Sequence, residues 1–375
     1  MSASLYVGLM SGTSMDAVDA ALVSIDSAGT TLIATHLHPI PDPMRRQIAA
    51  LSRTGPDEIE RMGTLDRELG ALFAVAALQL LRGASTPPAR VAAIGSHGQT
   101  IRHRPPCNGR GTPQSFTLQI GDPNTIAEHS GITTVADFRR RDIAAGGEGA
   151  PLAPAFHAAA FARPDCGRAI VNIGGFANVT LLDGARLGAG FDTGPGNSLL
   201  DGWIHRHRGE ACDRDGRWAA GGTVVPALLE RLLQHPFFSR RGPRSTGREA
   251  FHMDWLDECI GAQSPVPGPR DVQATLAELT AVSIARGIQS GPVDVAEVYL
   301  CGGGAHNRDL VNRLGRHLPG KRLDSTAGIG MAPDWVEAVT FAWLAHQTLR
   351  GLAGNAPVVT GARGTRVLGG IYPGA

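Results

Sequence analysis

The sequence predicts an α/β fold with two domains of related architecture. Apolar stretches with the two-residue period of a strand alternate along the chain with stretches of helical period, which favours helices packed on sheets. Two apolar strands around a turn of small residues occur near residues 5–25 and again near residues 168–182. A chain of 375 residues is also too long to fold around a single small hydrophobic core, and its length suits two domains of ordinary size.

The expected elements of the first half begin with two strands on either side of the stretch SGTS, at residues 4–9 and 18–25. A helix is predicted over residues 66–82, because apolar residues recur there on one helical face and a glycine follows. The next elements are a buried strand that runs into the polar loop SHGQT, a short helix, a strand and an alanine-rich helix, at residues 91–95, 125–131, 132–137 and 154–162.

The second half repeats the strand, small-residue turn and strand in RAIVNIGGFANVTLLDG (168–184). The stretch GFDTGPGNSLLDGWI (190–204) is expected to form a turn that caps a helix starting near Asn197. Residues 236–270 are rich in Pro, Gly and Arg and are interpreted as an excursion outside the core. The remaining predictions are a helix, a strand that enters a glycine-rich turn, a helix and a last apolar helix, at residues 272–290, 298–302, after 307 and 335–351.

The composition is that of a soluble globular protein, with 42% hydrophobic residues, 18% charged residues and a net charge of +1. This balance argues against nucleic acid or a membrane surface as the main partner. The five cysteines are scattered without a C-x-x-C motif, and no signal peptide or long apolar stretch is visible, so a reduced, cytoplasmic location is expected. Only Lys321 is a lysine, so an anion site must use Arg, backbone N–H groups or a metal.

The tetrapeptide SGTS at residues 11–14 is a candidate anion site, because backbone N–H groups and hydroxyls can surround a phosphate. The alternative is an ordinary hairpin turn, which Gly and Ser also favour. The stretch is not a P-loop, since a strand and not a helix is expected to follow it. The near-match GRHLPGK (315–321) lacks the final Ser or Thr. Zinc-protease and serine-hydrolase motifs are absent from the sequence.

A glycine-bearing hairpin thus begins each half, and the turn CGGGAHN (301–307) follows late in the second half. This layout is similar to that of the actin/hexokinase/sugar-kinase superfamily, in which ATP lies in a cleft between two ribonuclease H-like domains. The first domain is then expected to comprise residues 1–163 with about 335–375, and the second residues 164–334. Closure of such domains excludes water from phosphoryl transfer.

Seven stretches, in order and over nearly the whole chain, resemble the anhydro-N-acetylmuramic acid kinase family. The resemblance implies an enzyme of peptidoglycan recycling that takes 1,6-anhydro-N-acetylmuramic acid, ATP and water. It opens the anhydro bridge and phosphorylates the 6-oxygen, with Mg²⁺ required and a homodimer commonly formed. The stretches are GLMSGTSMDAVDAALV, IGSHGQTIRH, LQIGDPNTIAEHSGI, DFRRRDIAAGGEGAPL, NIGGFANVT, FDTGPGNSLLD and CGGGAHN.

Three other functions stay open on the sequence. A plain hexose or amino-sugar kinase of the same superfamily would use the same ATP site without cleaving an anhydro bond. A glycosidase with paired carboxylates would need no nucleotide. A sugar-sensing regulator on a kinase fold would usually carry a helix-turn-helix extension, and the first predicted strand here begins at residue 4.

Asp192 is the candidate general base, because the reaction must take a proton from the water that attacks the anomeric carbon. A turn or cap residue is the alternative for this aspartate. Asp16 is a candidate to hold Mg²⁺ through water, or else a solvated hairpin carboxylate. For the glycines, close packing is the alternative to ligand contact. The residues assigned to ATP are Gly12, Thr13, Ser14, Met15, Asp16, Ala17, Val18, Asp19, Gly174, Gly175, Asn178, Gly302, Gly303, Gly304 and Asn307.

Sugar recognition needs directional polar groups and a cation for the lactyl carboxylate, which Arg139 can bind through two hydrogen bonds. His97 is interpreted as a binding residue and not as an acid or base. Two positions depart from the family pattern, because Ala17 and Glu148 stand where Gly and Gln are expected. The first matters only if the backbone there needs a positive φ. The residues assigned to the sugar are Ser96, His97, Gln99, Arg139, Asp142 and Glu337.

Overall fold

The computed structural model describes residues 3–12, 14–106, 114–240, 246–247 and 250–375. The chain divides into two compact units, of which unit 1 comprises Met1–Ala160 and Trp335–Ala375, and unit 2 comprises Phe161–Asp334. Within the described residues, no helix is both long and apolar enough to cross a lipid bilayer.

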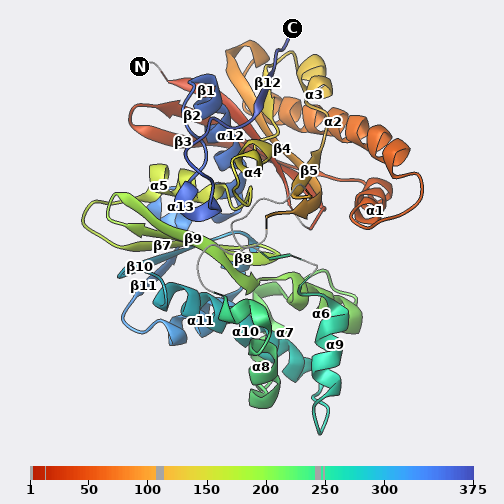
Figure 1. Cartoon of the computed structure of the whole chain (residues 1–375), viewed down its shortest axis with the longest axis vertical. Coiled ribbons are helices and arrows are strands. Elements are labelled where there is room, and N and C mark those ends of the chain that lie inside the picture. Colours follow the sequence, from red (N-terminus) through yellow and green to blue (C-terminus); the bar gives the residue numbers. More distant parts are fainter. Residues whose placement is uncertain (1–2, 13, 107–113, 241–245, 248–249) are drawn as a thin grey trace. The chain divides into compact units, whose positions relative to one another are not determined.

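Unit 1 is built on a mixed sheet that has seven strands among the described residues: β1 (Ser4–Ser11), β2 (Ala17–Asp26), β3 (Gly29–Pro39), β4 (Val91–Arg104), β5 (Phe116–Ile120), β6 (Thr134–Ala136) and β12 (Gly370–Tyr372) (Figure 1). Strands β1, β2 and β3 form an antiparallel meander. Strand β4 returns parallel to β1, and β6 runs parallel to β4. The order is β12-β6-β4-β1-β2-β3, and β5 pairs with the second half of β4.

Unit 2 repeats this arrangement with the strands β7 (Arg168–Ile173), β8 (Phe176–Asp183), β9 (Arg186–Pro195), β10 (Glu297–Cys301) and β11 (Arg322–Ser325). The first three again form an antiparallel meander, β10 is parallel to β7, and β11 is parallel to β10. The order β11-β10-β7-β8-β9 therefore matches β6-β4-β1-β2-β3 of unit 1 strand for strand. The predicted α/β class is confirmed, and both sheets have the strand order of a ribonuclease H-like fold.

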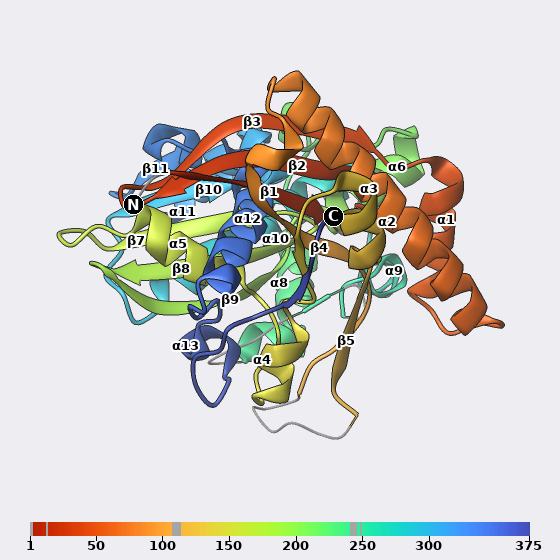
Figure 2. The ribbon, with the colours of Figure 1, turned by 90° about the horizontal axis from the view of Figure 1, so that it is seen from above.

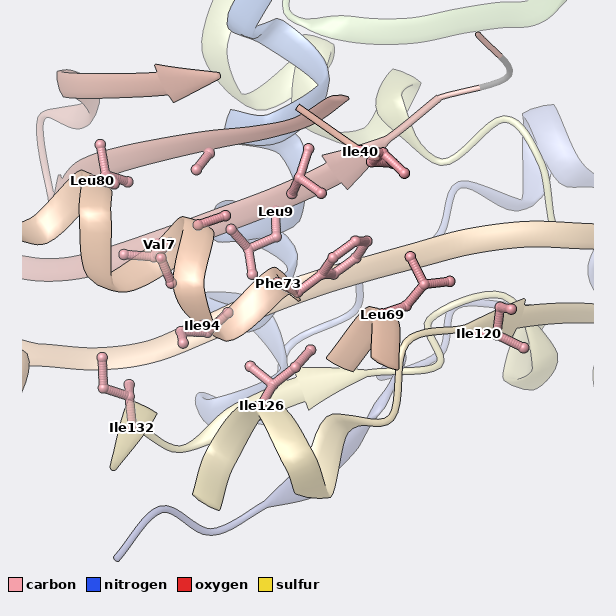
Figure 3. Close-up of a cluster of buried hydrophobic side chains, with 14 of the residues drawn as sticks. Val7, Leu9, Ile40, Leu69, Phe73, Leu80, Ile94, Ile120, Ile126 and Ile132 are labelled. Carbon is pink, nitrogen blue, oxygen red and sulfur yellow. The ribbon is translucent and has the colours of Figure 1, made fainter. Parts of the chain in front are cut away.

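The helices of unit 1 are α1 (Asp42–Leu51), α2 (Glu58–Gly83), α3 (Pro123–Ser130), α4 (Arg140–Ala144), α5 (Ala153–Phe161, whose last residue begins unit 2), α12 (Val336–Leu349) and α13 (Pro357–Thr360). Successive residues of β1 point to opposite faces of the sheet. Val7 and Leu9 lie in one buried cluster with Leu69 and Phe73 of α2 (Figure 3). Gly8, between them, faces α12.

Helix α12 lies against β1 and β4, and two glycines allow this close approach (Figure 2). A Cβ atom on Gly8 would lie 1.8 Å from the carbonyl oxygen of Ala338. One on Gly95 would lie 2.0 Å from the carbonyl oxygen of Phe341. Because both neighbours are backbone atoms, the helix itself would have to move away from the sheet to accept a larger residue.

We expect Gly8→Ala to destabilise the protein by about 1–3 kcal/mol, the usual penalty for forcing an atom into a close-packed interior. Urea unfolding followed by circular dichroism measures the change. Gly63→Ala in α2 is the matched control, since a Cβ atom there meets nothing within 4 Å. An unchanged free energy of unfolding for Gly8→Ala would mean that α12 does not pack as closely as described.

The helices of unit 2 are α6 (Ser198–Arg208), α7 (Arg217–Ala220), α8 (Pro226–Leu233), α9 (Met253–Gly261), α10 (Pro269–Gln289) and α11 (Arg308–His317). Helix α10 is the centre of the unit, because it is buried along most of its length. One side packs with Val179 and Leu181 on the sheet, and the other packs with α6, α8 and α9. The interpretation of residues 236–270 as an excursion is therefore wrong for α9, whose Leu256 is fully buried.

Two strands extend further than the sequence predicts. The stretch SHGQT, expected to be a loop, continues β4, because Ser96 pairs with β1 and Gln99 pairs with both β1 and β5. The stretch FDTGP, expected to be a turn, belongs to β9, where Asp192 pairs with Asn178 of β8. In both cases a neighbouring strand satisfies the backbone of a segment whose polar and glycine residues are typical of loops.

Candidate functional site

The β1–β2 hairpin of unit 1 carries the first group of expected nucleotide contacts. At its tip, Met15 N–H donates to the Gly12 carbonyl at 3.3 Å. The Ser14 hydroxyl and the Ala17 N–H both donate to Oδ1 of Asp16, whose side chain is exposed. Thr13 lies outside the described residues. The hairpin tip thus combines backbone groups with an exposed carboxylate.

The positions that follow the tip enter the sheet. Val18 is fully buried in the core of unit 1, and Asp19 pairs with Met10 across the hairpin. Among the described residues of the hairpin tip, Met15 has a positive φ, at 57°, and Ala17 does not. The departure at position 17 therefore places no strain on the backbone.

Gln99 holds the hairpin against β4. Its Oε1 accepts a hydrogen bond from the Ser11 hydroxyl at 2.6 Å, and its Nε2 lies 3.4 Å from the Gly12 carbonyl and 3.2 Å from that of Thr100. The Gln99 side chain is buried, and both ends of its amide have partners. This geometry favours a role in ordering the hairpin over direct contact with a sugar.

Ser96 and His97 precede Gln99 on β4, and both are buried. The Ser96 hydroxyl oxygen has no hydrogen-bond partner among the described residues. His97 Nε2 lies 3.0 Å from Nε of Arg139, whose Nη1 donates to the Gly149 carbonyl at 2.8 Å. The structure thus brings together two of the expected sugar-binding residues, His97 and Arg139.

Asp142 is fully buried and is engaged by three donors. The Gly149 N–H, the Asn355 amide and the Thr360 hydroxyl each lie 2.8 Å from its carboxylate oxygens. The carboxylate ties the loop after α4 to the C-terminal segment, and this favours a structural role for it. Glu148, the second departure, is also buried in this loop, and its N–H donates to the Thr360 carbonyl at 2.8 Å.

Glu337 lies in the first turn of α12 and is half-buried. Phe341, four residues further on, has its ring 4.7 Å from the His97 ring, measured between centroids. Residues four apart share one face of a helix. The structure therefore places Glu337 on the face of α12 that lies toward His97.

In unit 2, Asp192 lies in a row of polar side chains across three strands. It pairs with Asn178 on β8, and Asn178 pairs with Asn172 on β7. The neighbours of Asp192, Phe191 and Thr193, approach α10, so Asp192 points to the opposite face of the sheet. Directly paired residues share a face, which brings the three polar side chains together.

Two members of this polar row have a side-chain oxygen without a hydrogen-bond partner among the described residues. These oxygens are buried and belong to Asn172 and Asn178. Oδ2 of Asp192 accepts from the N–H of Thr246 at 2.8 Å. Sequence reasoning missed Asn172, whose only signal was its place before the second glycine turn, and it missed Thr246, which carried no signal.

The second hairpin turn, at Gly174 and Gly175, is held by the N-terminus of α6. The N–H of Asn197 donates to the Gly174 carbonyl, and the N–H groups of Gly196 and Ser198 donate to that of Gly175. A Cβ atom on Gly196 would lie 2.3 Å from the Gly174 carbonyl oxygen. The turn is thus positioned by backbone contacts that only a glycine at 196 permits.

In the glycine-rich turn after β10, Gly302 and Gly304 pack closely against neighbouring residues, whereas Gly303 does not. Gly302 has a φ of 75°, and a Cβ atom there would lie 2.4 Å from Oδ1 of Asn172. A Cβ atom on Gly304 would lie 2.2 Å from Ile173. Gly303 is exposed and is open to a ligand. Asn307 caps α11, because its Oδ1 accepts from Leu310 N–H at 3.0 Å.

No group of three or more His, Cys, Asp or Glu side chains in the described part of the chain is arranged to hold a metal ion directly. A metal ion bound by the described residues would therefore need oxygen atoms from a ligand or from water in addition to protein side chains. The exposed carboxylate of Asp16 fits such a partial role, since hydrated Mg²⁺ accepts one or two carboxylates beside phosphate oxygens.

Comparison with known proteins shows similarity along the whole chain. The model of the family described as anhydro-N-acetylmuramic acid kinase matches residues 4–374. A relative of that name from Pseudomonas fluorescens (strain Pf0-1) is 51% identical over 371 residues, which cover 98% of this chain and 99% of the relative. Another relative of that name, from Saccharophagus degradans, is 50% identical over 373 residues, which cover 99% of this chain and 100% of the relative. A solved ROK family glucokinase from Streptomyces griseus, in complex with glucose and AMPPNP, is 14% identical with a TM-score of 0.40, over 92% of this chain and 100% of that chain.

Proposed function

Since the chain belongs to the anhydro-N-acetylmuramic acid kinase family, we propose that it phosphorylates 1,6-anhydro-N-acetylmuramic acid with ATP while water opens the anhydro bridge. The anomeric carbon gains the water oxygen, and its bond to the 6-oxygen breaks. The released 6-oxygen takes the γ-phosphoryl group of ATP. The products that leave are N-acetylmuramate 6-phosphate and ADP. We further propose that the enzyme is a cytoplasmic homodimer that acts in cell-wall recycling, as the family resemblance implies.

The polar row of unit 2 supports Asp192 as the general base of this reaction. Its carboxylate lies on the face of the sheet away from α10, where the Thr246 N–H holds one of its oxygens. Asn178 and Asn172 place two more oxygens in the same row. A positioned carboxylate can take the proton of the attacking water, and amide oxygens can accept hydrogen bonds from a water or a hydroxyl.

The two glycine-bearing hairpins are proposed to bind the same ATP, with the turn at Gly303 beside the nucleoside. Backbone N–H groups carry the phosphate contacts in this proposal, because the hairpin turns at residues 12–19 and 173–178 contain no lysine or arginine. Asp16 is proposed to hold Mg²⁺ through water. When bound, the ion would neutralise charge that develops on the transferred phosphoryl group.

If Gln99 orders the first hairpin, replacing it should weaken ATP binding. We expect Gln99→Leu to raise the KM for ATP by about tenfold, because the buried Ser11 hydroxyl loses its partner and the Gly12 carbonyl loses a donor. Steady-state rates at varied ATP measure this change. Gln119→Leu is the control, since Gln119 donates to Thr100 and Thr117 in the same sheet without contacting the hairpin. An equal rise in KM for both variants would contradict the role of Gln99.

The experiment that tests the proposed function is ADP release in H₂¹⁸O with 1,6-anhydro-N-acetylmuramic acid as acceptor. We expect one ¹⁸O atom in the sugar phosphate for each ADP, as mass spectrometry of rapidly quenched samples would show. A plain hexose or amino-sugar kinase would incorporate none. Opening of the anhydro bridge without nucleotide would instead identify a glycosidase and would contradict the proposal.

A further inference from the structure

We propose that His97 is a positioning residue, which holds the guanidinium of Arg139 in the orientation that binds the carboxylate of the acidic sugar. The inference rests on the proposed function and goes beyond it, because it assigns to a buried histidine the selection of an acidic over a neutral anhydro sugar. His97 acts in this through Arg139 and does not touch the reacting atoms.

His97 is itself held on two sides. Its Nδ1 lies 2.9 Å from the carbonyl oxygen of Gly98, and its ring lies 4.7 Å from that of Phe341 between centroids. Only 5% of the residue is exposed, so the imidazole has little freedom to rotate. Gly98 has a φ of 72°, and a Cβ atom there would lie 2.7 Å from the Ile120 carbonyl oxygen. The backbone that carries the acceptor for Nδ1 is therefore closely confined.

The partners of the two ring nitrogens determine the tautomer. The Arg139 side chain can only donate, so His97 Nε2 accepts the hydrogen bond from Arg139 Nε at 3.0 Å. Nδ1 then carries the hydrogen and donates to the Gly98 carbonyl. Burial lowers the pKa of His97 well below its ordinary value of 6.5, and the positive charge of Arg139 lowers it further. The imidazole thus stays neutral and able to accept.

Arg139 has a second anchor on a different segment. Its Nη1 donates to the Gly149 carbonyl at 2.8 Å, and the Gly149 N–H donates to the buried Asp142. Asp142 in turn binds Asn355 and Thr360 of the C-terminal segment. Two contacts at different nitrogens fix the plane of a guanidinium, and a preoriented plane loses less entropy when it binds a carboxylate.

This role makes a prediction about selectivity. 1,6-Anhydro-N-acetylglucosamine has the same bicyclic ring and acetamide as the proposed substrate but lacks the lactyl carboxylate. Loss of the His97 contact should therefore weaken binding of the acidic sugar and leave binding of the neutral sugar unchanged. A residue needed only for folding would affect both sugars equally.

The test compares His97→Leu, which cannot accept from Arg139, with His97→Gln, whose amide oxygen can. We expect His97→Leu to raise the KM for the acidic sugar by about tenfold, with kcat within about threefold and the neutral sugar unaffected. His97→Gln should restore most of the affinity. Calorimetric titration of each sugar gives the same comparison without turnover, and circular dichroism checks the fold. If His97→Leu does not fold, His97→Gln and Arg139→Lys carry the test, because lysine keeps the charge but loses the bond to His97.

Equal losses for both sugars, a fall in kcat alone, or a His97→Gln variant as impaired as a folded His97→Leu would overturn the proposal. So would Arg139→Lys with unchanged selectivity. These results differ from failure of the proposed function, in which the wild-type enzyme itself would release no ADP with the acidic anhydro sugar.

Discussion

Asp192→Asn is expected to lower the turnover of 1,6-anhydro-N-acetylmuramic acid by about 10²–10⁴-fold, the usual contribution of a general base. The amide has nearly the shape of the carboxylate, but its nitrogen cannot take a proton from water. Oδ1 of the new side chain can still accept from the Thr246 N–H, which now binds Oδ2 of Asp192. The fold and the affinity for ATP should therefore change little.

Asp183→Asn is the matched control for this variant, since Asp183 is an exposed residue at the end of β8, on the same sheet. We expect wild-type turnover for it. Coupled ADP-release assays measure turnover, and calorimetric titration with an ATP analogue measures nucleotide affinity. If Asp192→Asn kept its turnover but bound ATP weakly, Asp192 would be a nucleotide-binding residue and not the base.

Mild acid is expected to destabilise unit 1 strongly. Burial lowers the pKa of His157 to about 3, and burial with the charge of Arg139 lowers that of His103 to about 4. Burial and Arg139 lower the pKa of His97 in the same direction. Below pH 6.5 the unfolded chain gains protons that these native side chains do not take up, so stability falls as the pH falls.

The size of this effect follows from proton linkage. Each histidine removes about 1.4 kcal/mol of stability per pH unit between its unfolded and its folded pKa. Between pH 7.5 and 5.5, His157 alone should therefore remove about 1.4 kcal/mol. Urea unfolding at the two pH values measures it. His157→Leu should reduce the pH dependence by that amount, and His129→Leu, at an exposed position, should leave it unchanged. An unchanged pH dependence in His157→Leu would show that native His157 takes up its proton over the same pH range as in the unfolded chain, and would contradict the lowered pKa.

The elements with strong local periodicity could be predicted from the sequence. The helix expected at 66–82 lies within α2, and the last apolar helix coincides closely with α12. The extension of β4 through Ser96–Gln99 could not be predicted, because it depends on pairing with β1 and with β5. Polar and glycine residues in this stretch are typical of loops, and only the partner strands overrule that preference.

For the candidate site, too, the sequence predicts individual residues but not the long-range contacts that bring them together. Residue types and spacing singled out Asp192 and Asn178, but their pairing across β8 and β9 is a property of the sheet register. The Thr246 N–H reaches Asp192 from 54 residues away. Asp142 lies in a polar, glycine-rich stretch that indicates exposure, yet Asn355 and Thr360, more than 200 residues later, bury it. Contacts over such separations leave no pattern in a single sequence.

Hydrogen–deuterium exchange with and without a non-hydrolysable ATP analogue tests most directly whether one nucleotide contacts both hairpins. Exchange should slow at residues 12–19 and at residues 173–178 with the same dependence on analogue concentration. The amides of the edge strand β3 should exchange as before and serve as the internal control. Slower exchange in only one hairpin, or in neither, would contradict the account.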